Sequence, residues 1–298
     1  MSGTPVILVP TGFSDQSFIA LEQALSFAKR INGRIVLLSV IEEDKGLLSF
    51  LYEDKSKMTE ARNKVGEKLD EVAEEYGKKS GVAIETMVSA GVVYEEIVDV
   101  ADMVRAKFII MGTDGAPKGF RKKVIGSNAY RVVTMSHCPV ISINGKENNP
   151  GIKNIILPLD LQKETKQKVG KAIELSRLFG AKVHVISAYR ENDDYVINHL
   201  QKNMAQVIKY LKKHEVEVEY DMIKALPDED IHEVLLNYSN EQNADLVMVM
   251  TQQESNFTDY FIGSLAQSMI YHSQIPIMSM HPKQSKSVYT EGAPGFGI

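Results

Sequence analysis

The sequence has few features of a secreted or membrane-bound protein. It contains one cysteine, Cys138, among 298 residues, so it cannot form an internal disulfide, and a reducing compartment is favoured. No apolar run reaches the roughly 18 residues that a membrane span requires. The first residues also lack the charged and long apolar segments of a signal peptide. We therefore expect a cytoplasmic protein that does not contact a membrane.

The sequence also has no excess of positive charge. The formal net charge is −5 and the sequence has no long basic run, so we expect no binding to nucleic acid. The basic cluster of Lys118, Arg121, Lys122 and Lys123 is either a solvated surface turn or a group that neutralises phosphates. The hydrophobic fraction of 44% and the charged fraction of 24% are those of an ordinary globular protein.

Short apolar runs alternate with amphipathic segments. In the first half, strands are expected at residues 5–9, 34–41, 82–89, 107–111 and 139–143. The helices between them include one that Ser14 can cap and that Asn32 and Gly33 end, and a long one that begins near Lys57. The order βαβαβαβαβ predicts a parallel, doubly wound α/β sheet with right-handed crossovers.

The same pattern then repeats. A shift of 148 residues places Pro10 on Pro158 and residues 34–41 on 182–189 without a gap, and a shift of 137 places residues 125–143 on 262–280. Agreement at both ends indicates a duplicated domain. We expect a first domain at residues 1–145, a short polar linker, a second domain at residues 151–282, and a C-terminal tail at residues 283–298.

A glycine-rich stretch, MGTDGAPKGFRKKVIGSNA from Met111 to Ala129, follows the fourth expected strand. Glycines let backbone N–H groups approach an anion, and the N-terminus of the next helix, where Ser127 resembles a cap, adds its own donors. The stretch is therefore either a phosphate cradle or an ordinary strand-to-helix turn. It matches neither the P-loop nor the GxGxxG pattern.

The two halves differ at this loop. Where the first half has Gly112 and Gly115, the second has Met250 and Gln253, so we expect the second half to have lost the cradle. After the first strand it is the second half that has the polar residue, because Asp160 corresponds to Gly12 of the first half. The carboxylate of Asp160 either accepts hydrogen bonds from a ribose or base, or caps the following helix.

These residues resemble the universal stress protein family as a tandem two-domain member. The resemblance rests on the opening ILVPTG, on Ile-Gly-Ser at the fourth helix followed by Cys-Pro-Val, and on the glycine loop. It implies a Rossmann-like fold of the adenine nucleotide alpha hydrolase type, with five parallel strands in each domain. Nucleotide-binding members use a G-x2-G-x9-G-Ser/Thr loop for the phosphates of ATP and an Asp after the first strand for the adenosine. The site residues implied here are Pro10, Thr11, Val40, Met111, Gly112, Gly115, Gly126, Ser127 and Asn128.

The sequence departs from the family pattern twice. Ten residues, not nine, separate Gly115 from Gly126, and Gly12 stands where the family has Asp. The lost carboxylate removes a directional contact worth about 1–3 kcal/mol.

The resemblance implies a stress-response protein whose first domain binds ATP, with Mg²⁺ as a possible companion, for regulation rather than catalysis. One alternative is a scaffold that binds no nucleotide, or a binder of a small apolar ligand in the second half. Residues that either line such a pocket or fill the core are Met248, Met250, Phe257, Tyr260, Phe261 and Met269. The other alternative is a weak ATP hydrolase, in which Asp114 and Ser127 hold a cation through the phosphates.

Two further expectations concern contacts and metals. The resemblance implies that residues 139–143 pair with residues 276–280 to form an intramolecular pseudo-dimer, which leaves a further homodimer possible. The seven histidines show no paired spacing of metal ligands, so we expect no metal site.

Overall fold

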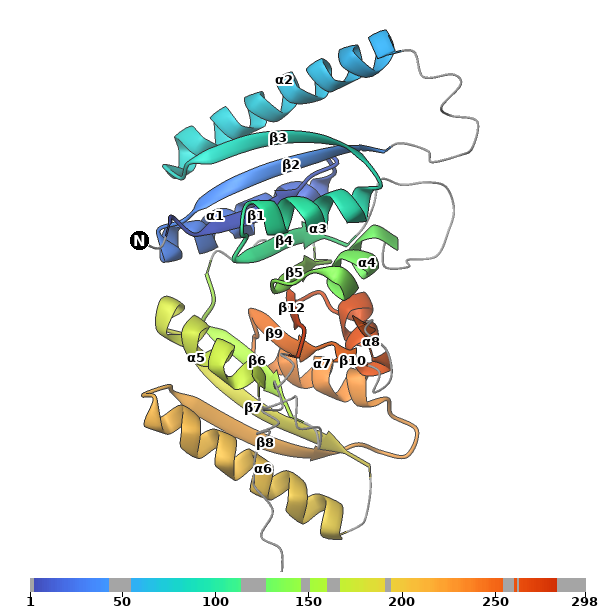
Figure 1. The fold of residues 1–298 in the computed structure, drawn as a ribbon. Helices are drawn as coiled ribbons and strands as arrows, with labels where there is room; N and C mark the ends of the chain where they lie inside the picture. Colours follow the sequence, from blue (N-terminus) through green and yellow to red (C-terminus); the bar gives the residue numbers. More distant parts are fainter. Residues whose placement is uncertain are drawn as a thin grey trace, which may run out of the picture.

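Strands and helices alternate through both halves of the chain (Figure 1). The computed structural model describes residues 3–42, 55–113, 127–145, 151–159, 167–190, 194–253, 260–261 and 263–282. The first half contains β1 (Val6–Pro10), α1 (Asp15–Ile31), β2 (Arg34–Glu42), α2 (Lys55–Ser80), β3 (Ile84–Gly91), α3 (Val93–Met103), β4 (Phe108–Gly112), α4 (Ser127–Met135) and β5 (Val140–Ile143). This order confirms the predicted one, with ends that differ by a few residues.

The second half repeats the order and adds one small hairpin. It contains β6 (Asn154–Pro158), α5 (Gln167–Phe179), β7 (Lys182–Tyr189), α6 (Asp194–Lys213), β8 (Val218–Lys224), α7 (Ile231–Glu241), β9 (Leu246–Met250), β10 (Gln252–Gln253), β11 (Tyr260–Phe261), α8 (Ser264–His272) and β12 (Ile277–Met280). The antiparallel pair of β10 and β11 lies where the first half has its glycine loop.

All the long strands join one sheet of ten, in the order β3-β2-β1-β4-β5-β12-β9-β6-β7-β8. Strands within each half are parallel, as the apolar runs predict. The two halves meet through β5 and β12, which are antiparallel and place Ile141 opposite Met278. The predicted pairing of residues 139–143 with 276–280 is confirmed, and it leaves only β3 and β8 as edges of this sheet.

The strand register confirms the duplication. In the first half Ile7 pairs with Ile35 and Phe108, and in the second half Ile155 pairs with Val183 and Leu246. Both β1 and β6 therefore lie at the same level between their neighbours. This equivalence lets each position of one half be compared with its counterpart in the other.

Each face of the sheet carries its own apolar layer. On one face α1, α2, α5 and α6 pack over side chains such as Ile7 and Ile155. On the other face α3, α4, α7 and α8 pack over side chains such as Leu8 and Ile156. Adjacent residues of one strand point to opposite faces, so a nearly continuous apolar strand satisfies both layers. Among the described helices, none combines the length and apolarity that a membrane crossing needs.

The predicted ends of α1 are confirmed. The Ser14 hydroxyl accepts a hydrogen bond from the Ser17 amide, and Asn32 closes the helix in the left-handed conformation at φ 49°. Gly33 must lack a side chain, because a Cβ atom there would lie 2.7 Å from the Pro5 carbonyl oxygen. These local signals fix the direction in which β2 returns to the sheet.

Side chains from both halves also meet beside the central strands. The Phe27 ring of α1 is fully buried and packs edge-on against Phe108 and against Phe179 of the second half, at centroid distances of 5.7 and 4.9 Å. Glu174 of α5 lies 2.7 Å from the Lys107 ammonium of the first half. The halves therefore share an apolar core and an ion pair, as well as a sheet.

Candidate functional site

The candidate site lies at the carboxyl ends of β1 and β4, which we call the first switch point. These neighbouring strands are paired up to Leu8 and Ile109, although β1 continues to Pro10 and β4 to Gly112. The helix after β1 covers one face of the sheet, and the helix after β4 covers the other. In doubly wound sheets, ligands bind where the connections diverge in this way.

Thr11 orders the turn from β1 into α1. Its side chain is 7% exposed, and its hydroxyl shares a 2.9 Å hydrogen bond with Ser17 and accepts another from the Phe13 amide at 3.0 Å. Its amide donates to the Leu38 carbonyl at 2.7 Å. The Thr11 hydroxyl is therefore committed to the turn, and the residue acts on a ligand through the shape it gives the backbone.

Gly12 is exposed and faces open space. A Cβ atom added there would meet no atom within 4 Å, and the backbone is outside the left-handed region that disfavours other residues. The local structure therefore has room for the Asp that the family pattern has at this position, although this sequence has Gly12.

Gly112, by contrast, is required by a neighbouring helix. A Cβ atom at this position would lie 3.0 Å from the Cβ and 3.2 Å from the carbonyl carbon of Gln16, in the first turn of α1. The side-chain amide of Gln16 in turn donates a hydrogen bond to the backbone carbonyl of Asn144, just after β5, at 3.0 Å. Gly112 therefore has a packing role, which is a reason for glycine besides the approach of a phosphate.

The structure brings together part of the predicted set. Pro10, Thr11, Met111 and Gly112 lie at the carboxyl ends of β1 and β4, Val40 lies near the same end of β2, and half-buried Asn128 is the second residue of α4. Gly115 and Gly126 lie outside the described residues, as do Asp114 and the basic cluster. Ser127 is the first described residue of α4.

The second switch point, at the ends of β6 and β9, is filled differently. The half-buried side chain of Met250 packs against the core at the position of Gly112, and β10 follows almost at once. Met248 and Met269 are fully buried, which favours a core role for these two over a pocket lining. Gln253 pairs with Tyr260 in the small hairpin. Asp160 lies outside the described residues.

Lys168 is a buried residue that the sequence analysis did not single out. Its side chain is 4% exposed, and its ammonium donates to the Met248 carbonyl at 3.4 Å, beneath the second switch point. The equivalent residue of the first half is the fully buried Ala20. The sequence did hold a signal for Lys168, because the two halves differ there: one has a charged residue and the other has an alanine.

One group of possible metal ligands also escaped the sequence analysis. Asp230, His232 and Glu233, at the start of α7, place one ligand atom each within 4.8 Å of the others. The His232 ring stacks on His272 at a centroid distance of 5.3 Å. We assign no metal here, because the Arg190 guanidinium lies 3.4 Å from the Asp230 carboxylate and already supplies a positive charge.

Cys138 is half-buried and packs against the apolar layer beside β5. Burial raises the pKa of this thiol, and Ser136 lies within 3.5 Å of the sulfur. The thiol therefore stays protonated near neutral pH, which does not suit a nucleophile.

The fold and the two switch points define a duplicated, doubly wound α/β protein. The sequence profile of the Universal stress protein family matches residues 4–144 and again residues 151–281. The chain therefore belongs to the universal stress protein family, as two tandem domains.

Individual relatives agree. The universal stress protein MJ0531 of Methanocaldococcus jannaschii is 31% identical over 144 residues, which are 46% of this chain and 80% of the relative. YxiE of Bacillus subtilis is 30% identical over 144 residues, or 46% of this chain and 97% of the relative. A universal stress protein structure from Archaeoglobus fulgidus covers 95% of this chain and all of its own, with a TM-score of 0.76 and 23% identity, and thus shares the tandem fold.

Proposed function

We propose that the first half binds an adenine nucleotide of the ATP type at the first switch point, and that the protein acts by regulated binding in a stress response. The observation that carries this proposal is the divergence of the connections after β1 and β4, which lead to helices on opposite faces of the sheet. Doubly wound sheets bind ligands at such a point, and Gly12 there leaves room because an added Cβ atom would meet nothing within 4 Å.

The neighbouring residues set the orientation of the nucleotide. Adenosine would lie over Pro10, Thr11 and Val40, and the phosphates would point toward α4, whose first amides carry positive partial charge. Gly115, Gly126 and Ser127 would cradle the phosphates, and Mg²⁺ would be held mainly by phosphate oxygens.

Regulation fits the first switch point better than catalysis does. Hydrolysis needs a base or a positioned water, and the described residues there are Pro10, Thr11, Gly12, Met111, Gly112 and Asn128. None of these is a carboxylate or imidazole, and the Thr11 hydroxyl is already committed to the turn. We therefore expect binding without appreciable turnover.

The second half would serve as a structural partner. Met250 occupies the position of Gly112, and the hairpin of β10 and β11 follows β9. A side chain at that position reduces the space for a phosphate near the backbone. One nucleotide per chain is expected.

Calorimetric titration of the full chain with ATP and Mg²⁺ tests the proposal. We expect one site per chain, lost in Gly115→Trp and kept in Gln253→Trp, the matched change in the second half. Bound ATP should also raise the thermal midpoint, since a ligand stabilises by RT ln(1 + [L]/Kd). Absence of heat and of a thermal shift at millimolar ATP would overturn the proposal in favour of the scaffold. Phosphate release that exceeds background and is lost in Gly115→Trp would instead establish the hydrolase.

A further inference from the structure

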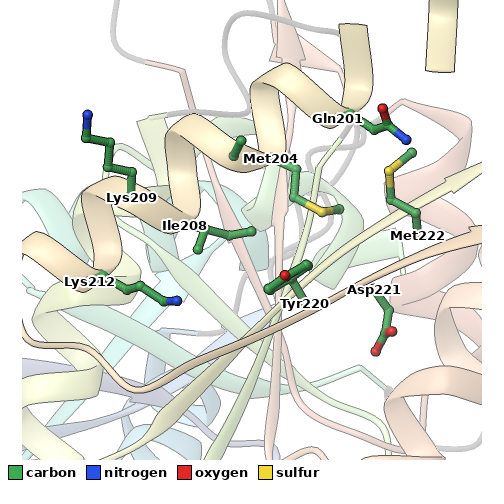
Figure 2. Close-up of a pocket in the computed structure, with 9 residues that line it drawn as sticks. Gln201, Met204, Ile208, Lys209, Lys212, Tyr220, Asp221 and Met222 are labelled. Carbon is green, nitrogen blue, oxygen red and sulfur yellow. The ribbon is translucent and has the colours of Figure 1, made fainter. Parts of the chain in front are cut away.

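An open groove of about 700 Å³ lies between α6 and the edge strand β8 (Figure 2). This volume is in the range of pockets that hold small molecules. The strand β7 separates β8 from β6, at the second switch point. The residues that line it are Gln201, Met204, Ala205, Ile208, Lys209, Lys212, Tyr220, Asp221 and Met222. Figure 1 shows α6 and β8 at the opposite end of the sheet from α2 and β3.

In the first half, hydrogen bonds join the equivalent helix, α2, to the equivalent strand, β3. There Thr86 of β3 donates to Asp70 of α2 at 2.6 Å, and Arg62 donates to the Val88 carbonyl at 3.4 Å. In addition, α2 lies more closely along β3 than α6 lies along β8. The two halves therefore differ in how closely this helix packs on its edge strand.

The two helices can be compared residue by residue. The strand register places Thr86 at Tyr220 and Val88 at Met222, a shift of 134. The same shift relates Gly81 to Glu215, which both have a left-handed backbone. The buried faces of the helices match with a shift of 135, which places Leu69 on Met204 and Asp70 on Ala205. The hydrogen-bonded pair of Thr86 and Asp70 thus corresponds to Tyr220 and Ala205, which line the groove.

Side-chain volume explains why α6 stands off. On α2 the buried side chains are Leu69 and Ala73, and Gly66 lies 4.0 Å from Val88, measured from an added Cβ atom. On α6 the buried side chains are Leu200, Met204, Val207 and Leu211. Larger residues hold the helix further from the sheet and leave the edge strand partly uncovered.

The walls of the groove are apolar, and two lysines give one end a positive charge. Met204 is buried, Ile208 and Met222 are half-buried, and the Tyr220 ring is 56% exposed. Lys209 and Lys212 lie one turn apart on α6, and Figure 2 shows Lys212 extending toward Tyr220.

The Lys212 ammonium is available to a ligand in the groove, whereas Figure 2 shows the Lys209 side chain extending away from Tyr220. Elsewhere on the helices lysines pair with glutamates, as Lys64 does with Glu60 at 2.7 Å. Among the residues that the structure describes, Lys209 and Lys212 have no such partner. Asp221, the acid that lines the groove, accepts a hydrogen bond from the Tyr238 hydroxyl at 2.7 Å.

We propose that this groove binds a small amphiphile with a single apolar chain and an anionic head group. The chain would lie on Met204, Ile208, Tyr220 and Met222, and the carboxylate or phosphate head would contact Lys212. Apolar burial supplies the affinity, and Lys212, with the field of nearby Lys209, selects the charge of the head. The proposal does not depend on nucleotide binding in the first half.

The chain has no tryptophan, so Tyr220→Trp introduces a single tryptophan in the groove, which can be excited selectively. We would titrate this full-length variant with dodecanoate below its micelle concentration, and with dodecanol as the uncharged control. The expected result is saturable binding of dodecanoate, with dodecanol bound about tenfold more weakly. Methionine-methyl NMR of the unmodified chain should show the same saturation at Met204 and Met222.

The charge is tested with two matched double variants on α6. Lys209→Gln with Lys212→Gln should weaken dodecanoate binding about tenfold, whereas Lys202→Gln with Lys213→Gln, outside the groove, should change it less than about twofold. Equal losses in the two variants, or equal binding of dodecanol, would overturn the anionic head. Signals that change with protein concentration and not with dodecanoate would assign the groove to a second copy and overturn the amphiphile.

Discussion

Replacing Gly12 with Asp should restore the contact to adenosine that this chain lacks. The local structure permits the change, because an added Cβ atom meets nothing within 4 Å and the backbone is not left-handed. The committed hydroxyl of Thr11 keeps the turn in place. The new carboxylate would emerge at the end of β1, where the family has its Asp.

The size of the effect follows from a charged hydrogen bond to a ribose or base. Such bonds contribute about 1.5–3 kcal/mol, which is roughly a 10- to 150-fold decrease in the Kd for ATP. The carboxylate lies on the adenosine side, so its repulsion of the phosphates should not cancel this gain. Calorimetric titration with ATP and Mg²⁺ at moderate salt measures the change directly.

Gly3→Asp is the matched control. It adds the same charge at another glycine whose surroundings are open, at the amino end of β1. We expect its Kd for ATP to equal that of the unmodified chain. If Gly12→Asp binds ATP no more tightly than Gly3→Asp does, the assignment of the adenosine side is wrong.

Three further predictions concern the joint between the halves. Phe27→Ala should lower the free energy of unfolding by about 3–5 kcal/mol in urea titrations, since the ring is fully buried, and a loss below about 1 kcal/mol would contradict the shared core. Gly145→Ala should cost about 1–3 kcal/mol, because its Cβ would lie 2.3 Å from the Gln274 carbonyl oxygen, whereas Gly170→Ala, in an open helix position, should not destabilise. Burial lowers the pKa of His281 from 6.5 to about 4, so its neutral form stabilises the fold above pH 6.5, and about 2–3 kcal/mol of that is lost as the pH falls toward 4. His281→Asn should remove that part of the pH dependence, and an unchanged stability profile would contradict it.

Much of the fold follows from patterns that are local in the sequence. Apolar runs such as residues 107–111 predict buried parallel strands, and Ser14 and Asn32 mark helix ends through their own backbone contacts. The match between the two halves then supplies the domain organisation. The pairing of β5 with β12 came from the resemblance to the family, because an edge strand alone does not name its partner.

The site was less predictable, because its key contacts join distant segments. Gly112 is glycine because the first turn of α1 lies against it, and the sequence gives no sign of that approach. Thr11 was among the predicted site residues, but turn geometry directs its hydroxyl to Ser17. Lys168 and the groove beside α6 depend on how closely a helix packs on the sheet, which side-chain volumes decide jointly.

The central claim is that one of two equivalent switch points binds nucleotide. Met111 lies at the first of them and Met250 at the second, so methionine-methyl NMR with ATP and Mg²⁺ reads both at once. The signals can be assigned with Met111→Leu and Met250→Leu. The account predicts a saturable shift of Met111 at one equivalent and no shift of Met250. A shift of Met250 alone, or of neither, would contradict it.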